Sequence, residues 1–173
     1  MTAGQAPARA IRVDRSIAAP SAHLWSVISS PGYLERCHPF CAANPVARWP
    51  GTGSHDIIYY YSGRVVHRRL LTWDDGIGYD LRVTTPDGIP QAQVRWQIDE
   101  LGEGQSRLMV TLQPLFSDHL PVAIRSLAYV MAGRPMRKYL AAVVAGVAYH
   151  AETGEQVARN QFGPHRWFSP RAS

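Results

Sequence analysis

The sequence predicts a single α+β domain, in which a meander of antiparallel strands lies between two short helices and a long helical region at the C-terminus. The chain has 173 residues, a usual length for one domain. Its middle alternates apolar and polar residues, as strands with one buried face do, and both flanks change to helical spacing. The alternation is clearest in three triplets: Tyr79/Leu81/Val83, Val94/Trp96/Ile98 and Leu108/Val110/Leu112.

A strand and two short helices are expected at the start of the domain, after a flexible tail at residues 1–10. Ile11, Val13 and Ile17 alternate along the first strand. Pro20 suits the first turn of a helix, which Ser30–Pro31–Gly32 then ends. A second helical segment, Tyr33–Cys37, ends before Pro39.

Turn residues divide the middle of the chain into extended segments. The breaks between them are short, so consecutive strands must be antiparallel. An edge strand is expected around Ala43–Trp49, because prolines interrupt it. The other expected strands are His55–Tyr61, Arg64–Trp73, Gly78–Thr84, Gln91–Asp99 and Ser106–Pro114.

Two helices are expected in the last third. The first carries Leu120, Ile124, Leu127 and Met131 on one stripe and ends at Gly133. Pro135 opens the second, and we expect both apolar stripes to face the sheet. The second stripe consists of Met136, Leu140, Val143, Val144 and Val147.

The C-terminal tail, residues 164–173, is unusual because Trp167 and Phe168 follow Gly163 and Pro164. Two large aromatic side chains favour a segment that docks on the domain or on a partner. A frayed end is the alternative.

The positive charge is concentrated near the C-terminus. The net charge is +5, and the chain is neutral up to Leu120, so the whole excess lies after it. A basic face suits an anionic membrane or an acidic partner, although a solvated helix face is the simpler interpretation. No apolar leader or spanning stretch is present and there are only two cysteines, so we expect a cytoplasmic protein.

The opening of the domain carries a resemblance to a known superfamily. In residues 16–28 an apolar strand meets Ala19–Pro20 and then a helix with the pair Leu24–Trp25. With the order of elements from Ile11 to Gly163, this resembles the START, birch-pollen-allergen and polyketide-cyclase superfamily, also called SRPBCC. The resemblance implies the helix-grip fold, a curved antiparallel sheet wrapped around a long C-terminal helix with an apolar cavity between them. Its members include carriers, lipid transporters, aromatase/cyclases and co-chaperones, so the fold does not decide the function.

The segment Cys37–His38–Pro39–Phe40–Cys41 is the densest group of reactive side chains. Two thiols and an imidazole are zinc-ligand types, with His55 as a fourth, but their spacing is poor. A packed loop with buried thiols is the simpler interpretation. A third places His38 at the cavity mouth as an acid–base group. We expect neither metal nor cofactor.

Aromatic residues in the strands are candidates for a ligand-binding wall. Tyr59, Tyr60 and Tyr61 must divide between the two faces of their strand. An ordinary core is the alternative for each aromatic residue, but so many hydroxyl and indole groups favour a cavity. The expected ligand-binding residues are Trp25, Phe40, Tyr59, Trp73, Tyr79, Trp96, Leu140 and Val144.

Cationic side chains occupy one phase of the strand that follows. If Val65, His67 and Arg69 face inward, two polar groups enter the cavity and need partners or an oxygen-bearing ligand. The alternative is that His67 and Arg69 face solvent. The candidate catalytic residues are His38, His67, Tyr61 and Arg69.

Binding or carriage of a small hydrophobic ligand, aromatic, polyketide-like or lipid-like, is the leading function. Alternatives are a polyketide cyclase or dehydratase acting in the same cavity, and a co-chaperone-like module. Isolated polar groups in the cavity favour a carrier, whereas a His–Tyr or His–Asp pair inside it favours an enzyme. Arginine-rich strands with interleaved aromatic residues would suit RNA, but the resemblance to the helix-grip fold assigns these aromatic residues to a cavity, so we expect no nucleic-acid partner. A transient membrane or acidic-partner contact through the basic helices is expected, and the oligomeric state is left open.

Overall fold

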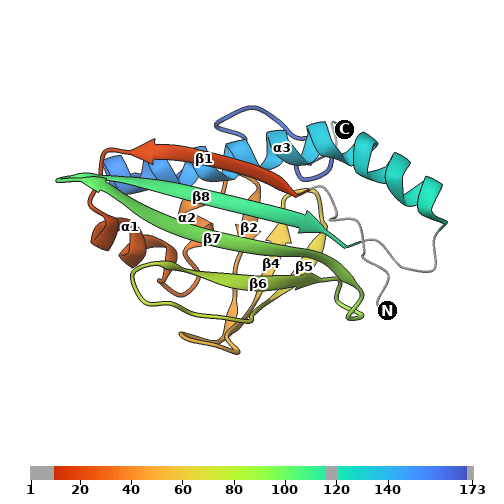
Figure 1. Ribbon diagram of the computed structural model, residues 1–173, viewed down its shortest axis with the longest axis horizontal. Helices are drawn as coiled ribbons and strands as arrows, with labels where there is room; N and C mark the ends of the chain where they lie inside the picture. Colours follow the sequence, from red (N-terminus) through yellow and green to blue (C-terminus); the bar gives the residue numbers. More distant parts are fainter. Residues whose placement is uncertain (1–9, 116–120, 171–173) are drawn as a thin grey trace, which may run out of the picture.

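A curved antiparallel sheet wraps around one long helix in the computed structural model, which describes residues 10–115 and 121–170 (Figure 1). The described elements are β1 (Ile11–Ile17), α1 (Ser21–Ile28), α2 (Leu34–Cys37), β2 (Cys41–Ala43), β3 (Val46–Arg48), β4 (His55–Tyr60), β5 (Val65–Leu70), β6 (Gly78–Thr84), β7 (Pro90–Gly102), β8 (Gln105–Pro114) and α3 (Val122–Thr153).

The sheet is a meander of consecutive strands, and the first strand of the chain pairs with the last one at an edge. Its order is β1-β8-β7-β6-β5-β4-β2, with β3 also paired to β4, and every pair is antiparallel. The meander expected from the turn residues is confirmed. The expected edge strand is present as two short strands, β2 and β3, on either side of Pro45. Proline lacks the N–H that a continuous ladder would need.

The pleat of the sheet places one set of alternating side chains against α3. Val94, Trp96 and Ile98 of β7 are buried on this side, and so are Leu108, Val110 and Leu112 of β8. Opposite them, α3 buries the expected stripe of Leu140, Val143, Val144 and Val147. The core therefore lies between the concave face of the sheet and the second half of α3.

The prediction of two C-terminal helices is wrong, because α3 runs unbroken through Gly133 and Pro135. A proline inside a helix removes its own N–H and leaves the carbonyl four residues earlier without a partner. That residue is Met131, which is 70% exposed, so water can replace the lost hydrogen bond. The helix ends at Gly154, whose φ of 75° gives the left-handed cap that glycine adopts without strain.

The expectation that the first apolar stripe faces the sheet is also wrong. The first turns of α3 extend past the ends of β1 and β8 (Figure 1), and Ile124, Leu127 and Met131 are exposed. Leu120 lies outside the described residues. No helix in the described ranges is long and apolar enough to cross a membrane.

After α3 the chain folds back as a segment without regular structure, residues 155–170, which we call the C-terminal strap. The backbone N–H of Val157 donates to the carbonyl of Arg36, and that of Asn160 donates to the carbonyl of Pro39. Farther on, His165 and Phe168 are buried. The strap thus packs along α2 and the loop after it.

Candidate functional site

A cavity of about 330 Å³ lies between α3 and the concave face of the sheet. This volume falls in the range of small-molecule sites, about 300–1,000 Å³. Most of its walls are apolar, and they include Val94, Trp96 and Leu112 from the sheet and Leu140 and Val143 from α3. Such walls favour a ligand that is mainly hydrophobic.

The mouth of the cavity is marked by the exposed members of its lining. Arg64 in the β4–β5 turn and Gln91 at the start of β7 are exposed, and Ala132 and Met136 of α3 are half-buried. The mouth therefore opens beside the half of α3 that leaves the sheet.

The C-terminal strap forms one wall. Trp167 and Phe168 both line the cavity. The ring of Phe168 lies 4.6 Å from the ring of Tyr60 and 4.3 Å from that of Tyr139, measured between centroids. His165 Nε2 lies 2.9 Å from the carbonyl oxygen of Pro135, which ties the strap to α3.

Three buried polar side chains form a chain of hydrogen bonds at the cavity wall, which we call the His38 relay. His38 Nε2 lies 3.0 Å from Tyr139 Oη, and Tyr139 Oη lies 2.8 Å from Tyr60 Oη. The backbone N–H of Phe40 donates to His38 Nδ1 at 3.1 Å. All three side chains, His38, Tyr60 and Tyr139, line the cavity.

Burial fixes the protonation state of the relay. It lowers the pKa of His38 to about 3, with a further contribution from the nearby charge of Arg68. Burial also raises the pKa of Tyr60 to about 12 and that of Tyr139 well above its usual range. All three groups are therefore neutral near pH 7.

These states set the direction of the hydrogen bonds that His38 makes. Because His38 Nδ1 accepts from a backbone N–H, the single ring proton sits on Nε2 and is donated to Tyr139 Oη. Tyr139 Oη and Tyr60 Oη then share one hydrogen bond, in which either hydroxyl can be the donor. The two hydroxyls have two protons for this one bond, and no other acceptor for either proton lies among the described residues, so one proton is left to donate at the cavity wall.

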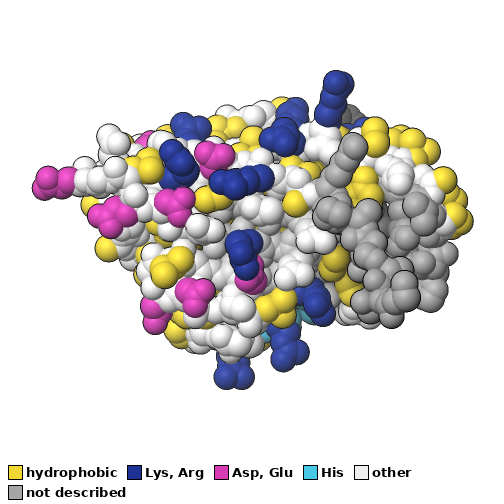
Figure 2. Space-filling view, viewed as in Figure 1, with side chains coloured by type: hydrophobic (Ala, Val, Ile, Leu, Met, Phe, Trp, Pro, Cys, Tyr) yellow, Lys and Arg dark blue, Asp and Glu magenta, His cyan; other side chains and the backbone are white. Residues whose placement is uncertain are grey.

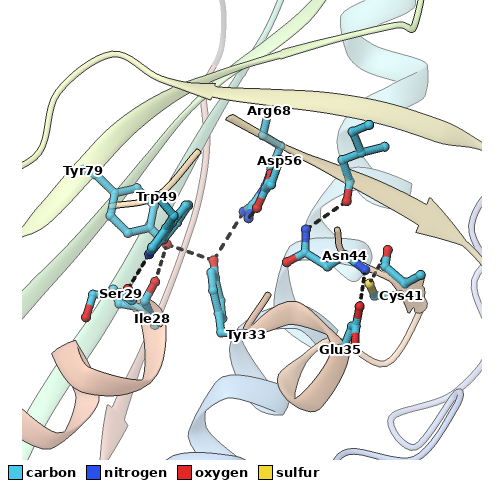
Figure 3. Close-up of polar contacts among 12 residues, drawn as sticks. Ile28, Ser29, Tyr33, Glu35, Cys41, Asn44, Trp49, Asp56, Arg68 and Tyr79 are labelled. Carbon is cyan, nitrogen blue, oxygen red and sulfur yellow. Dashed lines mark hydrogen bonds and ion pairs between the residues drawn. The ribbon is translucent and has the colours of Figure 1, made fainter. Parts of the chain in front are cut away.

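A second polar network surrounds Arg68, which also lines the cavity (Figure 3). Its guanidinium forms a two-point ion pair with Asp56, in which Nε donates to Oδ1 at 2.8 Å. Nη1 donates to Tyr33 Oη at 3.3 Å, and the hydroxyls of Tyr33 and Tyr79 lie 2.8 Å apart. Arg68 and Asp56 are 4% and 0% exposed, so the positive charge is neutralised inside the protein.

Comparison with known proteins identifies the architecture. No family model and no curated protein matches the sequence. Among solved structures, the aromatase/cyclase Zhui from Streptomyces sp. R1128 has a TM-score of 0.63 at 17% identity, over 83% of this chain and 93% of that one. A START superfamily protein from Mycobacterium smegmatis has a TM-score of 0.58 at 15% identity, over 82% of this chain and 97% of that one.

The chain has the helix-grip fold. The resemblance to the START and polyketide-cyclase superfamily is thus confirmed at the level of the fold. DynU16, a protein of the dynemicin biosynthetic locus, gives a TM-score of 0.65 at 16% identity over 85% of this chain. This chain spans only 48% of DynU16, about half its length.

Within the helix-grip fold, β5 adopts the alternative phase, in which His67 and Arg69 face outward, so the hypothesis that they enter the cavity is wrong. Val66, Arg68 and Leu70 are buried, whereas Arg69 is exposed and His67 lies half-buried beside His55 on the outer face. The inner phase tolerates a cation because Asp56 stands directly opposite Arg68 in the β4–β5 pair. Tyr61 is 36% exposed in the turn and does not line the cavity.

The expected ligand-binding residues are divided by the structure. Trp96 and Leu140 line the cavity, whereas Phe40 and Val144 are buried beside it and Tyr59 is 42% exposed on the opposite face of β4. The remaining three, Trp25, Trp73 and Tyr79, pack together outside the lining, with Trp25 and Trp73 rings 5.1 Å apart and Trp73 and Tyr79 rings 5.7 Å apart.

Sequence reasoning missed Arg68 and Tyr139 and did not choose Tyr60 from its neighbours. The hairpin contains a usable signal for Arg68. Tyr60 and Arg64 pair across the Ser62–Gly63 turn. Four residues farther from the turn on each strand, the paired residues are Asp56 and Arg68. Tyr139 has no comparable signal, because its contacts come from distant elements.

The two cysteines are buried thiols. Burial raises the pKa of Cys37 and of Cys41 to about 12, so both stay protonated. Within residues 10–115 and 121–170, no group of three or more His, Cys, Asp or Glu side chains could hold a metal ion. His55 lies beside His67 on the outer face of the sheet, away from the Cys37–Cys41 segment.

Proposed function

We propose that the protein binds and carries a small, neutral, largely apolar molecule that bears an acceptor oxygen. The observation that supports this most directly is the one spare hydroxyl proton of the Tyr60–Tyr139 pair, which we assign to Tyr60, in a mainly apolar wall. A buried donor without an acceptor costs about 1–3 kcal/mol, so a ligand carbonyl or ether oxygen opposite Tyr60 gains affinity. The relay thus selects for an oxygen.

The neutrality of the ligand follows from Arg68. Its charge faces the cavity, but Asp56 already neutralises it. An anionic ligand would bring a second, uncompensated negative charge into a buried site, which is costly. A ketone, ether or phenol satisfies the wall without that cost.

The class of ligand is aromatic or polyketide-like in this proposal. Trp96, Trp167 and Phe168 give the cavity flat aromatic walls, which suit planar rings. The name of the structural neighbour Zhui, an aromatase/cyclase, supports the same choice for this chain.

A cyclase or dehydratase is the second candidate, because a His–Tyr pair lies inside the cavity. The state of His38 favours the carrier. Both ring nitrogens are engaged and the pKa is about 3, so the ring is a poor proton acceptor near pH 7. Proton exchange at the methyl group of bound 2-acetylnaphthalene in D₂O, followed by NMR, separates the two. A carrier leaves the rate unchanged, whereas an acceleration that Tyr60→Phe abolishes would replace the carrier with an enzyme.

Competition among three probes tests the proposed ligand class. Each probe is titrated against a fluorescent apolar dye bound to the protein. The probes are 2-acetylnaphthalene, its alkene isostere 2-isopropenylnaphthalene and the anion 2-naphthoate. We expect the ketone to bind about 3–10-fold more tightly than the alkene, the effect of one hydrogen bond, and the anion to bind most weakly. Ala132→Trp, at the mouth, should weaken all three. Tightest binding by the anion, or no displacement by any probe, would refute the proposal.

A further inference from the structure

The first half of α3 exposes a contiguous apolar face. Ile124, Leu127, Val130 and Met131 are 51%, 59%, 64% and 70% exposed. Their spacing of three and four residues places them on one side of the helix. Figure 2 shows hydrophobic side chains gathered at this end of the molecule. Four such side chains together are more than the scattered apolar residues of an ordinary surface.

Cations continue the same face along the helix. Arg134 and Lys138 follow Met131 at spacings of three and seven residues, and both are exposed, as is Arg137 beside them. The sequence of α3 contains no Asp or Glu before Glu152. The face therefore changes from apolar to cationic along its length, with no acidic residue between.

This face adjoins the cavity mouth. Ala132 and Met136, on the neighbouring side of the same turns, line the cavity. Whatever covers the exposed face also lies beside the route into the cavity.

We propose that the first half of α3 is an interfacial helix that docks the cavity mouth on an anionic lipid bilayer. The four apolar side chains enter the boundary between headgroups and acyl chains, and Arg134, Arg137 and Lys138 contact lipid phosphates. The helix lies on the membrane and does not cross it, since no described helix is long and apolar enough to span one.

A membrane explains both halves of the face better than a second copy of the chain does. Another copy of this face would cover the apolar residues but would bring the same three cations and no acid to pair with them. An anionic bilayer offers apolar depth and negative charge side by side. The inference goes beyond the proposed function, because vesicle binding needs no ligand in the cavity.

Sedimentation with lipid vesicles tests the inference. The full-length protein is mixed with vesicles of phosphatidylcholine alone or with phosphatidylglycerol added. We expect binding to the anionic vesicles and a loss of about tenfold or more in the Leu127→Glu/Met131→Glu variant, which places charge where the apolar side chains insert. The matched control is Ile77→Glu, at a site that is 57% exposed in the β5–β6 turn, and it should bind like the wild type.

The cations are tested separately with Arg134→Gln/Lys138→Gln. Each cation near an anionic surface contributes about fivefold to binding, so this variant should bind about 25-fold more weakly to the anionic vesicles. A thermal melt of each variant serves as the control for folding. Absence of binding to anionic vesicles, or an equal loss in Ile77→Glu, would overturn the inference. A third result would also overturn it: the protein does not bind vesicles and forms a dimer in analytical ultracentrifugation, which only Leu127→Glu/Met131→Glu dissociates.

Discussion

Arg68 and Arg69 are neighbours in β5 with opposite environments. The pleat aims Arg68 inward at Asp56 and leaves Arg69 exposed. Alternation alone cannot decide which of two adjacent arginines is buried. The decision comes from the partner strand, where Asp56 stands opposite Arg68. The orientation was therefore predictable only by combining strand phase with hairpin register.

Replacing Arg68 tests the importance of that pair. Arg68→Met leaves Asp56 buried without a counter-charge and should lower the free energy of unfolding by about 3–5 kcal/mol in urea denaturation. Arg69→Met, the matched control on the exposed face, should change it by less than about 0.5 kcal/mol. Equal effects of the two substitutions would contradict the assigned orientation of β5.

The low pKa of His38 predicts a pH dependence of stability. The ring has a pKa of about 3 when folded and 6.5 as a free side chain, so between these values only the unfolded chain binds a proton there. The contribution of neutral His38 to the free energy of unfolding is therefore fully present above about pH 6.5 and is lost as the pH falls toward 3. Urea denaturation from pH 7 to 4 should show wild type losing up to about 1.4 kcal/mol per pH unit more than His38→Gln. Parallel curves for the two proteins would mean that His38 is not buried in its neutral form.

At the scale of elements, the close approach of α2 to α3 brings the relay together. A side chain at Gly146 would have its Cβ only 2.0 Å from the backbone oxygen of Cys37, so only glycine fits there. Two turns earlier on α3, Tyr139 meets His38, the residue that follows Cys37. The sequence predicts the helix from its apolar stripe, but it does not show which glycine allows another backbone to come close.

Two glycines of α3 provide a matched pair of substitutions. Gly146→Ala forces the α2 backbone away and should destabilise the protein by about 1–3 kcal/mol. Gly133→Ala meets no atom within 4 Å and should stabilise it by about 0.5–1 kcal/mol, because alanine favours a helix interior. Thermal and urea denaturation measure both. A stabilising Gly146→Ala would contradict the close packing of α2 on α3.

At the scale of the whole molecule, the strand meander and the buried half of α3 followed from periodicity and turn residues. Those are local properties of the sequence. The cavity did not follow from them, because its polar wall combines His38 from the α2–β2 loop, Tyr60 from β4 and Tyr139 from α3. The exposed half of α3 has the same apolar periodicity as the buried half. Only the length of the sheet shows that the apolar stripe of this half, with Ile124, Leu127 and Met131, lies past the strands and stays exposed.

The central claim is that the Tyr60 hydroxyl binds the oxygen of an apolar ligand. Calorimetric titration of 2-acetylnaphthalene and 2-isopropenylnaphthalene into wild type and Tyr60→Phe tests it most directly, with Tyr59→Phe on the outer face as control. We predict that Tyr60→Phe weakens the ketone by about 3–10-fold, leaves the alkene within about twofold, and that Tyr59→Phe changes neither. An equal change for ketone and alkene in Tyr60→Phe, or no change in either, would contradict the account.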